Sequence, residues 1–153
     1  MQVFKPPSRP QYADDAVTVF LAGSIEMGKA EDWQTKVQDA LKDKPVFVFN
    51  PRRDDWDTSW KQSMADENFA GQVQWEHDYL SRADYIFLYF DPETKSPISM
   101  MELGLFANHD GMIVVCPDGF WRKGNVEFIC QEYSIPFFNT LEDGIEELLT
   151  HVD

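Results

Sequence analysis

The stretch SPISMMELGL, residues 96–105, decides how the rest of the chain is interpreted. It follows a strongly apolar run, YIFLYF (residues 85–90), and a polar loop. Ser96 and Pro97 favour the start of a helix, because a hydroxyl can cap free N–H groups and proline needs no N–H donor in the first turn. Residues 98–108 are apolar almost all round, which predicts a buried helix.

Glu102 is the one charged residue of this predicted helix. At helical spacing it shares a face with Ile98, Leu105 and Phe106. A carboxylate among apolar side chains costs free energy unless it is paired or used in chemistry. This segment alone therefore leaves two interpretations open: a glutamate held by a neighbouring donor, or a functional carboxylate.

Strands and helices alternate on both sides of this segment. Runs rich in β-branched and aromatic residues predict strands at 16–22, 45–49, 85–90, 111–116 and 134–138. Helical spacing predicts helices at about 31–43, 63–82, 98–108, 125–133 and 141–151. The alternation predicts an α/β protein with a flavodoxin- or Rossmann-like, doubly wound, five-stranded parallel sheet in the order 2-1-3-4-5, with helices on both faces.

Length and composition limit the number of domains and the kinds of partner that we expect. The 153 residues suit one domain, 1–153, in which the proline-containing residues 1–15 form an extended arm. The net charge of −14 argues against nucleic acid or a membrane as the main partner, and a small neutral ligand stays compatible. We expect no metal or cofactor, and a cytoplasmic location in which Cys116 and Cys130 stay reduced.

Unusual residues gather in three loops at the carboxyl ends of predicted strands. These are Gly23-Ser24, the segment Asn50-Pro51-Arg52-Arg53 with Trp56 and Trp60 beyond it, and the segment from Asp91 to Glu102. In the predicted strand order these loops meet at one cleft, where α/β proteins bind ligands. We therefore favour a binding role for Arg52 or Arg53.

The helix predicted at 63–82 carries a second group of polar residues near Trp75. Asp78 follows Trp75 by three positions, so we expect it to share the face of that ring and to approach the core. His77 has no second ligand at a metal-binding interval.

The chemistry of the cleft is narrowed by what the sequence lacks. It has no Gly-rich dinucleotide fingerprint, no P-loop, no Ser-His-Asp order and no metal cluster. Carboxylates and aromatic rings remain. A buried carboxylate nucleophile with a second carboxyl group for proton transfer can break a glycosidic bond with retention, and aromatic rings can stack on a flat base.

Four motifs in this order, LAGSI (21–25), NPRRDDW (50–56), QVQWEHDYL (72–80) and SPISMMELG (96–104), carry a resemblance to a known family. Over residues 17–130 the sequence resembles the nucleoside 2-deoxyribosyltransferase superfamily, especially its deoxyribosyltransferase-like branch. The resemblance implies the doubly wound fold. It also implies a role in nucleotide salvage and a homo-oligomer, dimer or larger, whose active sites are shared between subunits.

The resemblance implies specific roles for residues. Glu102 would attack C1′ of a 2′-deoxyribonucleoside, and Asp78 would assist protonation of the leaving nucleobase before a second base takes its place. Asn125 would contact the hydroxyl groups of the substrate sugar that is bound in a neighbouring subunit. The expected substrate-binding residues are Gly23, Ser24, Asn50, Arg52, Arg53, Trp75, Asp91, Ser96 and Asn125.

Three positions depart from the pattern of the transferases. Ser96 stands where an aspartate usually binds the sugar 5′-hydroxyl, Phe20 replaces a tyrosine that often steadies the glutamate, and no aromatic tail is obvious at 150–153. A sister group that hydrolyses deoxynucleoside 5′-monophosphates has a serine at the position of Ser96, so this activity is the alternative. Glu26, where that group has a basic residue, would repel phosphate. A non-catalytic nucleotide-binding module is the third hypothesis.

Overall fold

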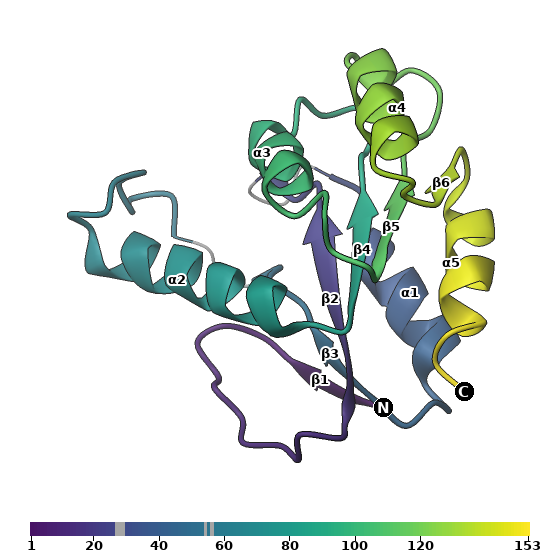
Figure 1. Ribbon diagram of the computed structural model, residues 1–153. Coiled ribbons are helices and arrows are strands. Elements are labelled where there is room, and N and C mark those ends of the chain that lie inside the picture. The colour runs from purple at the N-terminus through teal and green to yellow at the C-terminus, as the bar shows by residue number, and fades with distance from the viewer. Residues whose placement is uncertain (27–29, 54, 56) are drawn as a thin grey trace.

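The computed structural model describes residues 1–26, 30–53, 55 and 57–153, and these form a six-stranded sheet in which all paired strands are parallel (Figure 1). The strand order is β1-β3-β2-β4-β5-β6. The strands are β1 (Gln2–Phe4), β2 (Val17–Gly23), β3 (Val46–Phe49), β4 (Tyr85–Tyr89), β5 (Met112–Val115) and β6 (Phe137–Phe138). The helices are α1 (Trp33–Leu41), α2 (Glu67–Arg82), α3 (Pro97–Leu105), α4 (Lys123–Glu132) and α5 (Leu141–Leu149).

The predicted fold class is confirmed, with one strand added. Strands β2 to β6 are the five predicted strands, and they occur in the predicted order 2-1-3-4-5. Residues 2–4 of the predicted extended arm form β1 at the edge of the sheet beside β3, so this part of the arm is a packed element. Phe4 stacks on Phe49 at 5.6 Å between ring centroids, so burial of an aromatic ring helps to hold this short strand.

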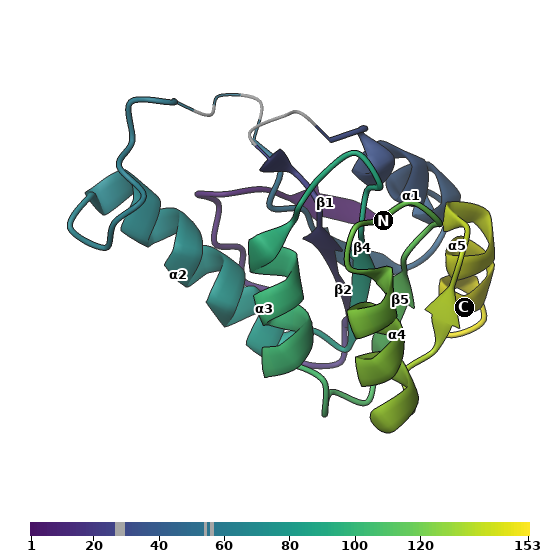
Figure 2. The ribbon, with the colours of Figure 1, turned by 90° about the horizontal axis from the view of Figure 1, so that it is seen from above.

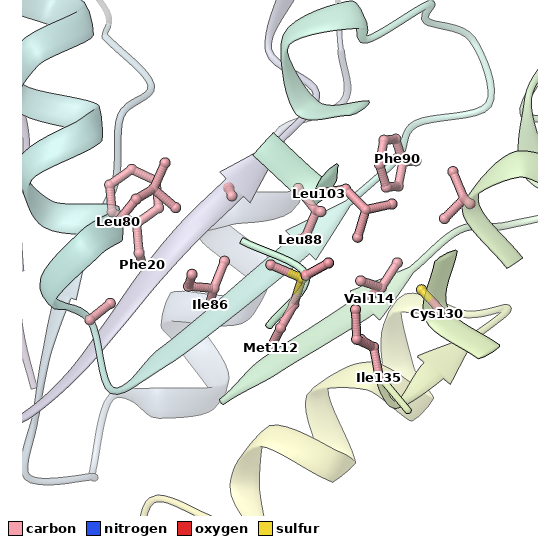
Figure 3. Packing of buried hydrophobic residues seen from close by; sticks show 14 of the residues in the cluster. Phe20, Leu80, Ile86, Leu88, Phe90, Leu103, Met112, Val114, Cys130 and Ile135 are labelled. Atoms are coloured by element: carbon pink, nitrogen blue, oxygen red, sulfur yellow. The ribbon is translucent and has the colours of Figure 1, made fainter. Parts of the chain in front are cut away.

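Helices cover both faces of the sheet. Helices α2, α3 and α4 lie on one face, and α1 and α5 lie on the other (Figure 2). Neighbouring residues of β2 point to opposite faces, with Phe20 in the core under α2–α4 and Leu21 in the core under α1 and α5. Figure 3 shows the first of these cores, in which Leu103 of α3 packs near Leu88 and Phe90.

Helix α3 is less buried than its sequence predicted. Leu103 and Ser99 face the sheet and are buried, but Ile98, Met101 and Leu105 are exposed. The physical reason is geometric: one helix on a sheet can bury only the side that it turns toward the sheet, and no other described element covers the outer side. No helix among the described residues is long and apolar enough to cross a lipid bilayer.

Candidate active site

The loops after β2 and β4 meet, as the sequence predicted. The Ser24 N–H donates to the Tyr89 carbonyl at 2.9 Å, and the Asp91 N–H donates to Ser24 Oγ at 2.8 Å. Gly23 makes this approach possible. It has a φ of +136°, and a Cβ built on it would lie 2.2 Å from the Tyr89 carbonyl oxygen, so a larger residue would push the two strand ends apart.

Three buried hydroxyl groups lie together where these loops join the start of α3. Ser24 Oγ is 2.5 Å from Ser96 Oγ, and Thr94 Oγ1 is 3.0 Å from Ser24 Oγ and 2.7 Å from Ser96 Oγ. The expectation that the Ser96 hydroxyl caps α3 is wrong, because Ser96 has a left-handed backbone (φ 46°) and makes no side-chain cap. Its hydroxyl is engaged by Ser24 and Thr94 instead.

The carboxylate that sits at the start of α3 comes from Glu26. Its Oε1 accepts hydrogen bonds from the backbone N–H groups of Lys95 at 2.8 Å and Ser96 at 2.7 Å. A negative charge is favourable at this end of a helix, where N–H groups have no partner within the helix. The sequence predicts only a repulsive charge at Glu26, because the contact joins residues that lie far apart in the chain.

The loop after β3 is held by several of the predicted binding residues. The Arg52 guanidinium donates to the carbonyls of Ala30 and Glu31, each at 3.0 Å, and Asn50 Oδ1 accepts the Arg52 N–H at 2.9 Å. The Asp91 carboxylate accepts the Glu31 N–H at 2.9 Å. The loops containing Asn50, Arg52 and Asp91 therefore converge, and in this structure these side chains bind other parts of the protein.

Arg53 connects the same loop to helix α2. It forms two hydrogen bonds with Asp55, at 2.9 and 3.1 Å, and its guanidinium lies 4.8 Å from the centre of the Trp60 ring. Its Nη1 is 3.5 Å from Gln72 Oε1, and Gln72 in turn hydrogen-bonds to Glu76. The predicted loop residues Asp54 and Trp56 lie outside the described residues.

Glu102 and Glu76 are the two carboxyl groups that the structure brings together. Helices α2 and α3 lie side by side (Figure 2), with the rings of His77 and Phe106 6.1 Å apart. Burial raises the pKa of Glu76 to about 7, and the Gln72 hydrogen bond opposes that rise. Burial raises the pKa of Glu102 to about 8, and the charge of Glu76 adds to the effect.

Glu102 also lacks the neighbouring donor that a structural glutamate would need. In the part of the chain that the structure describes, no hydrogen bond or ion pair to its carboxyl group is found. A half-buried carboxyl group with a raised pKa and no stabilising partner is the pattern of a functional site.

Asp78 and Trp75 contact other parts of the protein, and within the described part of the chain no hydrogen bond joins either of them to Glu102. Asp78 accepts hydrogen bonds from Arg9 and Gln74, each at 2.8 Å, and the Arg9 contact holds its pKa below the ordinary value. The expectation that Asp78 approaches the core is wrong, because its carboxylate is held at the surface by these two contacts. The Trp75 ring is buried in the core, and its Nε1 donates to the Ser8 carbonyl at 2.7 Å.

Three other observations concern the chemistry that the protein could perform. Asn125 is exposed near the start of α4, a helix that packs against α3. A surface hollow of about 350 Å³ lies between α4 and β6 and contains Cys130, but burial raises the pKa of that thiol to about 12, so it is no nucleophile at neutral pH. Among the described residues, no cluster of three or more His, Cys, Asp or Glu side chains could hold a metal ion.

Fold and site together define a doubly wound α/β protein with a pair of carboxyl groups between two helices beside the topological switch point. A sequence model of the nucleoside 2-deoxyribosyltransferase-like family matches residues 16–120, and the chain belongs to this family. The match includes Glu26, Glu76 and Glu102. A search of curated proteins finds no match to the chain.

Proposed function

We propose that the protein is a nucleoside 2′-deoxyribosyltransferase that exchanges the nucleobase of 2′-deoxyribonucleosides through a covalent intermediate on Glu102. The observation that carries the proposal is the Glu102–Glu76 pair: two carboxyl groups with raised pKa values, one of them without any donor among the described residues. Membership of the deoxyribosyltransferase-like family supports the same chemistry.

In the first step a Glu102 oxygen forms a bond to C1′ while the bond from C1′ to the base nitrogen breaks. The electron pair of that bond leaves with the base, which takes a proton from Glu76. In the second step a nitrogen of the incoming base attacks C1′, the ester bond to Glu102 breaks, and Glu76 accepts the proton that the incoming base loses. Two displacements give retention at C1′.

The mechanism assigns to Glu76 the proton-transfer role that the sequence suggested for Asp78. Glu76 is coupled to Glu102, whereas Asp78 is bound to Arg9. Two neighbouring carboxyl groups with raised pKa values share one proton near neutral pH. Because the pKa of Glu102 is raised further than that of Glu76, the free protein holds this proton mainly on Glu102. The reactive form has Glu102 ionised and Glu76 protonated, and a bound base that accepts a hydrogen bond from Glu76 favours that form.

The substrate is a nucleoside rather than a 5′-monophosphate. The backbone N–H groups at the start of α3 are occupied by the Glu26 carboxylate, which would repel a phosphate. Glu26 Oε1 accepts both bonds, and Oε2 has no partner among the described residues. We assign to Glu26 Oε2 the recognition of the sugar 5′-hydroxyl. Glu26 would in this way supply the carboxylate that the transferases usually have at the position of Ser96.

Other expectations stay part of this proposal. The protein acts on free nucleobases and 2′-deoxyribonucleosides in nucleotide salvage, in the cytoplasm and as a homo-oligomer. The free thiols of Cys116 and Cys130 are compatible with a reducing compartment.

The test is chromatography of reaction mixtures that contain deoxyinosine and adenine. Wild-type protein should produce deoxyadenosine, whereas deoxyguanosine monophosphate without an acceptor should stay intact. Glu102→Gln should lower the exchange rate by roughly 10³-fold or more, and Glu76→Gln by roughly 10²- to 10⁴-fold. Asp78→Asn is the matched control on the same helix and should stay within about twofold, since it loses only an exposed ion pair.

Each other outcome supports a different hypothesis. Free guanine from the monophosphate, with no deoxyadenosine in the first mixture, would make the protein a nucleotide hydrolase. Tight nucleoside binding without any product would make it a binding module. A strong loss in Asp78→Asn with little change in Glu76→Gln would return the proton-transfer role to Asp78.

A further inference from the structure

We propose that Gln72 is a positioning residue of the candidate site: its side-chain amide, held in place by Arg53, fixes the orientation of the Glu76 carboxyl group. The inference rests on the function proposed above, in which Glu76 moves the proton. Arg53 belongs to the loop segment for which the sequence predicted a binding role. Its contact with Gln72 of α2 connects that loop to the helix that carries Glu76.

The Gln72 amide has one possible orientation in this structure. Gln72 is buried, at 5% exposure. Its Nε2 donates to the Pro51 carbonyl at 3.2 Å, and Arg53 Nη1 donates to its Oε1 at 3.5 Å. A carbonyl can only accept a hydrogen bond and a guanidinium can only donate one, so the two ends of the amide cannot be exchanged. The nitrogen therefore keeps its second N–H group for one further acceptor.

Glu76 is that acceptor. It follows Gln72 by four positions on α2, so the two side chains lie one turn apart on the same side of the helix. The hydrogen bond from Gln72 opposes the rise in the Glu76 pKa that burial causes. A donor has this effect because it stabilises the charged form of the carboxyl group.

The Gln72 contact decides which oxygen of Glu76 carries the proton. The oxygen that accepts the Gln72 N–H is the poorer site for a proton, because two hydrogens would then face each other. The neutral acid therefore carries its proton on the other oxygen, which is left for the departing base. After the base has left, the Gln72 N–H stabilises the Glu76 carboxylate until the incoming base supplies a proton.

Arg53 is itself held in a fixed position. Its guanidinium forms two hydrogen bonds with Asp55, at 2.9 and 3.1 Å, and lies 4.8 Å from the centre of the Trp60 ring. The Arg53 side chain is only 12% exposed. A guanidinium with this little freedom can keep the Gln72 oxygen turned toward itself, and so the Gln72 nitrogen turned toward Glu76.

The other groups around Glu76 leave the donor role to Gln72. From α3 the charged group that faces Glu76 is Glu102, whose pKa is raised further by the charge of Glu76. From β2 the apolar Phe20 packs against Trp75, the residue before Glu76, with 6.0 Å between the ring centroids. A carboxylate and an apolar ring both disfavour the charged form of Glu76, so its stability depends on the Gln72 hydrogen bond.

Carbon-13 NMR titration of the glutamate carboxyl groups in the full chain tests this contact without any need for activity. The Glu76 signal is identified by its absence in Glu76→Gln. Gln72→Met keeps an unbranched side chain and removes the donor, so it should raise the pKa of Glu76 by about 1. Gln74→Met is the matched control, because Gln74 donates at 2.8 Å to Asp78, which is also four positions further along α2. It should leave the Glu76 pKa unchanged.

Arg53→Met is a second variant that leaves Gln72 in place. Without the guanidinium the amide can turn its oxygen toward Glu76, so the pKa of Glu76 should rise, by less than in Gln72→Met. Arg9→Met is the control for charge, because it removes a positive charge from the same helix at Asp78 without contacting Gln72. It should not change the Glu76 pKa.

The kinetics of base exchange separate positioning from substrate binding. Gln72→Met should lower kcat by roughly tenfold and leave the KM for deoxyinosine within about twofold. The pH at which activity is lost on the alkaline side should move upward, because a higher pKa keeps the proton on Glu76. A raised KM with unchanged kcat would make Gln72 a substrate-binding residue and overturn the inference.

The titrations distinguish failure of this inference from failure of the proposed reaction. An unchanged Glu76 pKa in both Gln72→Met and Arg53→Met would overturn the inference, even if the wild-type protein exchanges bases. A raised Glu76 pKa in both variants of a protein that exchanges no bases would overturn the proposed reaction and support the control of Glu76 by Gln72.

Discussion

Glu76 and Glu102 couple the pH of the solution to the stability of the protein. Their folded-state pKa values are raised to about 7 and about 8 from an ordinary value of 4.5. From about pH 4.5 up to about pH 8 the folded state binds more protons than the unfolded state. The free energy of unfolding therefore falls as pH rises through this range. A tenfold difference in proton affinity corresponds to about 1.4 kcal/mol, so we expect a loss on the order of a few kcal/mol between pH 5 and pH 8.

Urea unfolding at several pH values measures this effect. Wild-type protein should unfold at lower urea concentration at pH 8 than at pH 5, and Glu102→Gln should show a distinctly flatter pH dependence because it removes one of the two groups. Asp78→Asn is the control and should retain the wild-type slope over this range. Equal slopes for wild type and Glu102→Gln would show that Glu102 does not hold a raised pKa.

The role proposed for Glu26 is to bind the sugar 5′-hydroxyl and to exclude a 5′-phosphate. Replacing it by glycine frees the Lys95 and Ser96 N–H groups and relieves a left-handed backbone, since Glu26 has a φ of 43°. Glu26→Gly should raise the KM for deoxyinosine by roughly tenfold and give measurable binding of inorganic phosphate, followed by the amide NMR signals of Lys95 and Ser96.

Glu31→Ala supplies the matched control for this experiment. It also removes one negative charge near the site, but the Glu31 side chain pairs with Lys36 at the surface and does not contact the start of α3. Phosphate binding that is equal in the two variants would mean that net charge, and not the occupied N–H groups, excludes phosphate.

Helix α5 packs so closely on the sheet at Gly144 that a larger residue does not fit there without displacing its neighbours. A Cβ built on Gly144 would lie 2.2 Å from Val115 Cγ2 and 3.2 Å from Phe87 Cζ, both in fully buried residues. Gly144→Ala should therefore destabilise the protein by about 1–3 kcal/mol, although alanine is the better helix former.

Gly71 in α2 is the comparison, because a Cβ there would meet no atom within 4 Å. Gly71→Ala should stabilise the protein by about 0.5–1 kcal/mol through helix propensity alone. Thermal unfolding of the two variants beside wild type measures both changes. Shifts of the same sign would contradict the close packing of α5 on β5.

The elements also show what could be predicted from the sequence. Buried parallel strands are continuous apolar runs, so the run at residues 85–90 identified its strand and the alternation identified the fold. Strand β1 has three residues and depends on its pairing with β3, which no local pattern reveals. The meeting of the three loops followed from the strand order, and the hydrogen bonds of Ser24, Arg52 and Asp91 show that these loops converge.

The directions of side chains at the candidate site could not be predicted, because the neighbouring elements decide what each side of a helix contacts. Periodicity showed that Trp75 faces the core. It could not show that Glu76, the next residue, turns toward Glu102 of α3. It also could not show that Asp78, three positions after Trp75, turns toward Arg9 of the N-terminal arm. Glu26 contacts Lys95 and Ser96, which lie 69 and 70 positions further along the chain, and no sequence pattern indicates this contact.

The proposed homo-oligomer and the proposed reaction make one joint prediction about the whole molecule, because the resemblance implies sites shared between subunits. If a site uses Glu102 from one copy and Asn125 from its partner, two inactive variants can complement each other. Co-expressed Glu102→Ala and Asn125→Ala chains would form mixed dimers in which one of the two sites has both residues intact. Random pairing should restore about a quarter of the wild-type exchange activity, although each variant alone is nearly inactive.

The control is co-expression of Glu102→Ala chains with Glu102→Gln chains. No pairing of these chains contains an intact Glu102, so no activity should be restored. Full activity of Asn125→Ala alone would remove Asn125 from the site. Glu102→Ala and Asn125→Ala chains that associate without restored activity would mean that each chain builds its site from its own residues.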